Sequence, residues 1–305
     1  MTTITGTTRV FYCIADPIDQ VRAPEVFNAV FASARMDAIM VPLRVHPDRL
    51  ESTLRALFES PTVGGVSLSI PHKAAATAIV DRCSDIATIS GAVNAVRRDV
   101  SGALEGDLFD GVGFTGLLQR AAISYVGKRV LIIGAGGAAS AVSTALADEG
   151  ASAIGLYDPD VAKAHQLAER LRARFHIEAF AASSSDPSGF DLIVNASPLG
   201  LKDSDPLPVD VAAIPAHAAV CDILMKNQPT PLLRGARARG LVAEPGFDML
   251  IRQTPHYLDF FGYPELAEKV RRDDLFVREL LFPESLKPRR TGEIFDTTRE
   301  VLFSV

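Results

Sequence analysis

The stretch that decides the fold is VLIIGAGGAASA, residues 130–141. Its four leading apolar residues are typical of a parallel strand buried on both faces, and the small residues after it predict a helix over 138–147. The turn between them holds three glycines, Gly134, Gly136 and Gly137. Glycine lets the backbone N–H groups at a helix N-terminus approach a pyrophosphate closely.

A second apolar run, 153–157, follows and ends at Asp158, which lies 22 positions after Gly136. A carboxylate at the end of this second strand can accept hydrogen bonds from an adenosine ribose. A glycine-rich turn alone is often no more than a tight connection. The order of strand, turn, helix, strand and acidic residue, however, predicts a dinucleotide-binding unit.

Composition limits the other possibilities. The chain has 305 residues, 48% of them hydrophobic, which is enough for two domains with their own cores. The net charge is −6 and no basic stripe is present, so we expect no nucleic-acid partner. No apolar run reaches the roughly 18 residues of a membrane span, and the N-terminus lacks a clear signal peptide. We therefore expect a cytoplasmic protein, a monomer or homodimer, that acts on a small molecule.

Cysteine and histidine spacing argues against a disulfide framework and against a metal site. Cys13, Cys83 and Cys221 are far apart and odd in number, which suggests reduced thiols. The six histidines form no metal-binding spacing, so we predict no metal.

Strands and helices alternate along the first third of the chain. The patterns predict strands at 10–14, 38–45 and 66–70, helices at 24–36 and 47–59, and a hairpin of 93–98 with 103–108. Further on they predict strands at 192–195 and 220–224, helical segments at 248–253 and 264–281, and a surface tail from Pro283.

We therefore predict an α/β protein of two domains. Residues 1–110, completed by 246–305, form an α/β substrate-binding domain, and 111–245 form a Rossmann-type doubly wound parallel sheet. No low-complexity linker separates them, so the two domains are expected to share a cleft.

Polar residues at strand ends and turns are the candidates for chemistry, above all Lys73 and Asp110. Lys73 follows an apolar strand and Pro71, where partial burial suits an acid/base. Asp110, in GDLFDGVGF (106–114), is a possible ion-pair partner. Singly, each has a simpler explanation: a lysine after a strand is usually a solvated charge, and an aspartate before glycine usually forms a turn.

Taken together, these residues resemble the shikimate dehydrogenase family over about 10–280. The matching stretches are ADPIDQVRAP (15–24), VSLSIPHK (66–73), GAVNAV (91–96), GDLFDGVGF (106–114), VLIIGAGGAASA (130–141), DLIVNASPLGL (191–201), DILMKNQPTPLL (222–233) and GFDMLIRQ (246–253).

The resemblance implies a dehydrogenase that oxidises a ring hydroxyl of shikimate or quinate with NAD or NADP. By this resemblance Lys73 and Asp110 are the catalytic pair, and Ser69, Asn94 and Gln253 hold the other ring hydroxyls. The residues implied to hold the cofactor are Gly134, Ala135, Gly136, Gly137, Ala138, Asp158, Asn195, Ser197, Leu199, Gly246 and Met249.

Three positions depart from the family's pattern. Val21 and Ala23 replace two hydroxyl residues that bind the substrate carboxylate, and Met225 replaces a frequent tyrosine. In addition, Leu108-Phe109-Asp110 replaces an Asn-Thr-Asp-like triplet. A buried carboxylate without donors costs several kcal/mol, so either Arg22 or Gln20 supplies them or the substrate differs from shikimate.

The charges after the second strand bear on the choice between NAD and NADP. NADP-specific relatives often carry an Asn-Arg-Thr-like sequence after the second strand, whereas this chain has Asp158-Pro159-Asp160. Two carboxylates repel a 2′-phosphate, so we expect NAD rather than NADP.

Two alternatives stay open beside the shikimate/quinate dehydrogenase. One is a non-catalytic regulatory homologue that binds NAD and a metabolite, although it would have no need of both Lys73 and Asp110. The other is a dehydrogenase of a different small hydroxylated ring, which the apolar residues Val21 and Ala23 favour.

Overall fold

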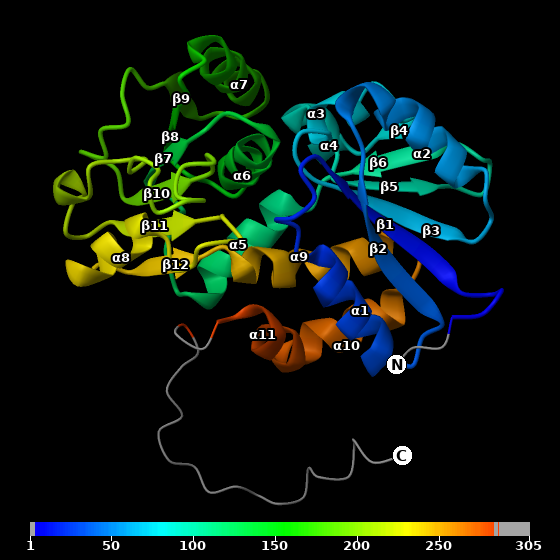
Figure 1. The fold of residues 1–305 in the computed structure, drawn as a ribbon. Coiled ribbons are helices and arrows are strands. Elements are labelled where there is room, and N and C mark those ends of the chain that lie inside the picture. Colours follow the sequence, from blue (N-terminus) through cyan, green and yellow to red (C-terminus); the bar gives the residue numbers. More distant parts are fainter. Residues whose placement is uncertain (1–3, 284–285, 287–305) are drawn as a thin grey trace, which may run out of the picture.

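The computed structural model describes residues 4–283 and 286, and two six-stranded sheets form its two lobes (Figure 1). Helices α5 (Asp110–Arg120) and α9 (Phe247–Phe260) run across the base of both lobes. This arrangement confirms the predicted α/β class with two sheets rich in parallel strands. Within the described ranges, no helix combines the length and the apolar character needed to cross a bilayer.

The first sheet has the order β2-β1-β3-β5-β6-β4 and is mixed. Its first three strands are parallel, whereas β5 pairs antiparallel with both β3 and β6. The strands are β1 (Arg9–Ala15), β2 (Ala38–Arg44), β3 (Val63–Leu68), β4 (Arg82–Cys83), β5 (Ala95–Arg98) and β6 (Leu104–Asp107). The β5–β6 pair is the predicted hairpin, closed by Asp99, whose carboxylate accepts from the backbone N–H groups of Ser101 and Ala103.

The second sheet has the order β12-β11-β10-β7-β8-β9 and is parallel throughout. Its strands are β7 (Arg129–Ile133), β8 (Ala153–Tyr157), β9 (Glu178–Ala181), β10 (Leu192–Asn195), β11 (Ala219–Asp222) and β12 (Ala243–Pro245).

Helices cover both faces of this second sheet, as the apolar run of β7 requires. Val130 and Ile132 belong to a core shared with α6 (Gly137–Asp148) and α7 (Val161–Arg174). Leu131 and Ile133, which point the other way, pack with α8 (Pro231–Ala238). Alternate side chains of one strand thus fill two cores, which is the doubly wound arrangement.

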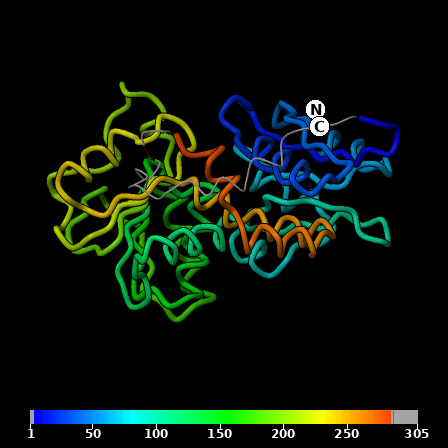
Figure 2. The backbone as a smooth tube through the Cα atoms, turned by 90° about the horizontal axis from the view of Figure 1, so that it is seen from below, coloured from blue at the N-terminus to red at the C-terminus, as the bar shows by residue number. Residues whose placement is uncertain are grey.

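The core of the first lobe is built from both ends of the chain. Phe11 and Phe27, from β1 and α1 (Ala23–Ser33), pack with Tyr257 and Phe261 near the end of α9. The helices α10 (Pro264–Arg272) and α11 (Leu275–Leu281) continue this core. Figure 2 shows these last helices, in orange, lying along the blue and cyan N-terminal lobe.

Several predicted boundaries are wrong. The strand expected at 66–70 runs from Val63 to Leu68, because the chain then reverses in a turn where His72 N donates to Ser69 O at 2.9 Å. The segment expected as one helix over 264–281 is two helices. Asp273 has an extended backbone, and its side chain accepts from Leu275 N at 3.1 Å, which starts a new helix.

The other helix limits also shift. The helix expected at 24–36 ends at Ser33, and the one expected at 47–59 opens with a 3-10 turn, Pro47–Arg49, before α2 (Leu50–Phe58). The segment expected at 248–253 extends to Phe260. The strands expected at 38–45 and 220–224 end at Arg44 and Asp222. The tail predicted from Pro283 lies almost wholly outside the described residues.

Candidate active site

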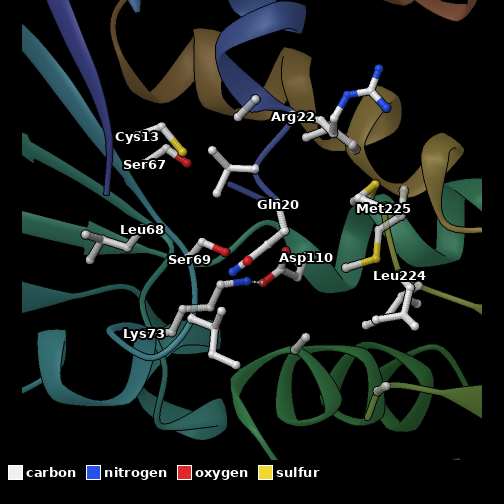
Figure 3. Close-up of a pocket in the computed structure, with 18 of the residues that line it drawn as sticks. Cys13, Gln20, Arg22, Ser67, Leu68, Ser69, Lys73, Asp110, Leu224 and Met225 are labelled. Atoms are coloured by element: carbon white, nitrogen blue, oxygen red, sulfur yellow. Dashed lines mark hydrogen bonds and ion pairs between the residues drawn. The ribbon is translucent and has the colours of Figure 1, made fainter. Parts of the chain in front are cut away.

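A cavity of about 460 Å³ lies between the lobes, at the carboxyl ends of β1, β3, β10 and β11. Both sheets and α9 contribute to its wall (Figure 3). Ligands of open α/β sheets bind at this end of the strands. Of the residues predicted for the site, the cavity is lined by Val21, Ala23, Ser69, Lys73, Asp110, Ala138, Ser197, Met225, Met249 and Gln253.

Lys73 and Asp110 meet in the wall of this cavity. The Nζ of Lys73 donates to Oδ2 of Asp110, and their side chains are only 15% and 6% exposed. Lys73 opens the short helix α3 (Lys73–Ala76), and its carbonyl accepts from Val93 N at 2.8 Å. Asp110 is the first residue of α5, where the helix dipole favours a carboxylate. The fold therefore brings together two residues from separate motifs, and they form one buried ion pair.

Asn94 supports this site from beneath. It is 1% exposed and is not among the residues that line the cavity. Its Nδ2 donates to Oε1 of Gln253 at 3.3 Å, and its Oδ1 accepts from Phe109 N at 3.0 Å. Asn94 thus holds Gln253 and the residue before Asp110 in place, and its direct contact with a substrate stays a prediction.

The cavity also contains Tyr257, Ser67 and Cys13, which the sequence reasoning missed. Tyr257 donates to the carbonyl of Asn94 at 3.0 Å and accepts from Ser67 Oγ at 3.3 Å. Burial, followed by the nearby charge of Asp110, raises the pKa of Tyr257 well above its ordinary value. Burial likewise raises the pKa of Cys13 to about 12, so both groups stay protonated. Tyr257 lies one turn after Gln253, a spacing that could have revealed it.

The glycine turn after β7 reaches the catalytic pair. Gly134 has φ +107°, and a Cβ there would lie 2.8 Å from the carbonyl oxygen of Ala196. A Cβ at Gly137 would lie 3.1 Å from Cβ of Lys73, whereas one at Gly136 would meet nothing within 4 Å. The turn therefore leaves an open face at the N-terminus of α6, where backbone N–H groups are free to hold a pyrophosphate.

Asp158 closes the other side of this turn. Its Oδ2 accepts from Ala135 N at 2.8 Å, and its Oδ1 accepts from Asp160 N at 2.9 Å. Asp160 in turn pairs with Lys163 at 3.3 Å. The end of β8 thus carries two carboxylates, one against the glycine turn and one paired with lysine.

Asn195 and Leu199 shape the loop that follows β10. Asn195 is fully buried; its Nδ2 donates to Leu199 O at 2.9 Å and to Asp222 Oδ2 at 3.1 Å, and its Oδ1 accepts from Ser197 Oγ at 2.7 Å. Thr230 Oγ1 donates to the same Asp222 oxygen at 2.7 Å. Burial raises the pKa of Asp222 to about 6 despite these donors. Asn195 and Leu199 therefore set the loop's shape, and Ser197 reaches the cavity.

Two predicted cofactor residues, Gly246 and Met249, lie at the start of α9 and have different surroundings. Met249 lines the cavity. Gly246 instead lies against the loop that follows β11, since a Cβ at Gly246 would be 2.6 Å from Cα of Ile223. Its lack of a side chain serves close contact between α9 and β11.

Comparison with known proteins places this architecture in a family. The family model for the shikimate dehydrogenase substrate binding domain matches residues 13–96. A shikimate dehydrogenase (NADP(+)) of Rubrobacter xylanophilus is 36% identical over 254 residues, which are 82% of this chain and 89% of that protein.

Two solved structures share the fold. Shikimate 5-dehydrogenase of Listeria monocytogenes, in complex with shikimate and NAD, has a TM-score of 0.78 at 25% identity and covers 89% of this chain and 98% of its own. The 5-ketofructose reductase of Gluconobacter sp. strain CHM43 has a TM-score of 0.73 at 27% identity and covers 87% of this chain and 98% of its own. The resemblance of the motifs, the fold and the curated relatives agree: the chain belongs to the shikimate dehydrogenase family.

Proposed function

We propose that this protein is a nicotinamide-dependent dehydrogenase. It transfers a hydride between the carbon of a ring hydroxyl, in shikimate, quinate or a related hydroxylated ring, and the cofactor. The observation that carries this proposal is the buried Lys73–Asp110 pair, which lies in a cavity whose wall includes the glycine turn's own helix. Its membership of the shikimate dehydrogenase family supports the same reaction.

The chain's own residues supply proton transfer and orientation. Lys73 Nζ lies where it can give a proton to the carbonyl oxygen during reduction and take one from the hydroxyl during oxidation. Asp110 fixes the position of Nζ through their ion pair. We assign the binding of the other ring hydroxyls to Ser69 and Gln253, and their place in the lining of the same cavity supports this. The nicotinamide, when bound, gives or accepts the hydride.

We further propose the two-domain division, with 1–110 and 246–305 for the substrate and 111–245 for the cofactor. The core that joins β1 and α1 to α9, α10 and α11 supports the assignment of the C-terminal helices to the first lobe. Residues 1–3, 284–285 and 287–305 of these ranges lie outside the described part of the chain.

The charges at the end of β8 bear on the choice between NAD and NADP. The Rubrobacter relative is named for NADP(+), whereas the Listeria structure contains NAD. At the end of β8 this chain has Asp158, which accepts from Ala135 N, and Asp160, which pairs with Lys163 at 3.3 Å. Because two carboxylates repel a 2′-phosphate, we propose that NAD(H) is preferred.

The test is a steady-state assay with purified protein. Absorbance of the reduced nicotinamide is followed with shikimate, quinate and neutral analogues, each with NAD and with NADP. Turnover of a member of this panel supports the proposal. Tight binding of cofactor and ring ligand without turnover at any concentration would instead identify a non-catalytic regulatory homologue.

A further inference from the structure

The end of the cavity opposite the catalytic pair is apolar. Val21, Ala23, Met225 and Leu250 line the cavity and belong to one apolar cluster, and Leu224 lines the cavity next to Met225. Figure 3 shows Leu224 and Met225 across the cavity from Lys73. None of these side chains can donate a hydrogen bond to an anion.

Cations near this cavity already have partners. Of the residues described, those that line it include two cationic side chains, Lys73 and Arg22. Lys73 pairs with Asp110. Arg22 holds Glu25 with both arms of its guanidinium, through Nε to Oε1 at 2.8 Å and through a terminal nitrogen to Oε2 at 2.7 Å. Figure 3 shows this guanidinium directed away from the cavity, so its fork is used elsewhere.

Two other donors that line the cavity have acceptors within the protein. Ser67 Oγ donates to Tyr257 at 3.3 Å, and Tyr257 donates to Asn94 O at 3.0 Å. Gln20 extends toward Lys73 and Asp110, at the polar end, and its Nε2 donates to Pro17 O at 2.8 Å (Figure 3). Helix α1 begins at Ala23, and its second residue, Pro24, has no N–H to donate. Its first turn therefore offers fewer free N–H groups than an ordinary helix N-terminus does.

We propose that the physiological substrate is uncharged at the end remote from the reacting hydroxyl. It is a polyhydroxylated ring, or its ketone, that carries a neutral or apolar substituent where shikimate carries its carboxylate. A carboxylate in this position would lie against apolar side chains without enough donors, which strongly disfavours its binding. A neutral substituent of the same size instead buries apolar surface against Val21 and Met225. This inference rests on the proposed dehydrogenase function and specifies its substrate class.

The experiment compares shikimate with its methyl ester, which keeps the ring and its hydroxyls and removes the negative charge. We expect kcat/KM for the ester to exceed that for the acid by at least about tenfold. If the acid is used as well as the ester or better, the inference is overturned while the dehydrogenase function stands. If neither compound is turned over with either cofactor, the proposed function fails for these rings and the inference fails with it.

A double variant tests the stated cause. Val21→Ser with Ala23→Ser restores two hydroxyl donors and should raise the acid-to-ester ratio of kcat/KM by about ten- to a hundredfold. The matched control is Val126→Ser, at a position 63% exposed and outside the cavity, which should leave the ratio unchanged. An unchanged ratio in the double variant, or an equal shift in the control, would contradict the inference that the apolar end of the cavity excludes a carboxylate.

Discussion

Replacement of Lys73 by alanine separates proton transfer from cofactor binding. Alanine removes Nζ, and with it the acid/base beside the substrate, so kcat should fall by about 10²–10⁴-fold, or about 3–5.5 kcal/mol. Alanine keeps the Cβ that lies against Gly137, so the glycine turn does not move. The dissociation constant of the cofactor should therefore stay within about a factor of three, or 0.6 kcal/mol.

The same variant should be less stable, for a separate reason. It leaves Asp110, whose side chain is 6% exposed, as a buried carboxylate without its cation. Loss of one partner of a buried pair costs about 3–5 kcal/mol of the free energy of unfolding. A second substitution, Asp110→Asn, removes that stranded charge. The double variant should therefore regain stability without regaining activity, because the two residues act as a unit.

The assays are steady-state kinetics, cofactor titration by calorimetry and urea unfolding, with Lys128→Ala as the control for loss of a lysine outside the cavity. A Lys73→Ala protein that keeps more than about a tenth of the wild-type kcat would refute the acid/base role. A large loss of cofactor affinity would show that Lys73 acts mainly through the glycine turn.

Three further predictions concern the cofactor and the buried polar groups. Asp158→Ala should raise KM for NAD and reduce the preference for NAD over NADP, measured as a ratio of kcat/KM; wild-type protein that uses NADP equally well would contradict it. Because burial raises the pKa of Asp222 from 3.8 to about 6, ionising it costs the fold about 3 kcal/mol. The stabilisation from protonated Asp222 is complete below pH 3.8 and is lost as the pH rises through about 6, so the stability of wild type relative to Asp222→Asn should fall over this range in urea unfolding; a difference independent of pH would exclude this. Tyr257→Phe removes one of two donors to the buried carbonyl of Asn94, which keeps its bond from Leu68 N at 2.7 Å, and should lower the free energy of unfolding by about 0.5–1.5 kcal/mol; unchanged stability would show that the bond contributes nothing.

The sequence predicts the nucleotide-binding half of the fold well because its signals are local. The apolar run at β7 is typical of a strand buried on both faces, and the glycines after it are typical of the turn that leads into a helix in dinucleotide-binding folds. Helix α7 and strand β9 were not predicted individually, since the charged face of α7 and the short span of β9 give weak patterns. The break between α10 and α11 depends on the backbone of Asp273, which hydrophobic periodicity does not report.

Some features of the candidate site could also be predicted from the sequence, and others depend on the folded chain. Lys73 and Asp110 could be proposed because their motifs are distinctive, and the structure brings them into contact. The ion pair between Arg22 and Glu25 could not be decided from the sequence. An arginine three residues before a glutamate can pair with it, or can turn into the cavity instead. The supporting place of Asn94 depends on Gln253 and Phe109, which only the folded chain brings near.

The shared core of the first lobe sets the order in which a ribosome can complete this protein. Strand β1 emerges early, yet Phe11 and Phe27 pack against Tyr257 and Phe261, which are synthesised 230 to 250 residues later. At synthesis rates of about 5–20 residues per second, the N-terminal lobe waits on the order of ten to fifty seconds for these partners. The second sheet, formed from one continuous stretch, has all its strands earlier. N-terminal units usually fold first during translation, but here we expect the second sheet to form before the first lobe is complete. A stalled or truncated chain is then expected to expose the aromatic face of β1 and α1.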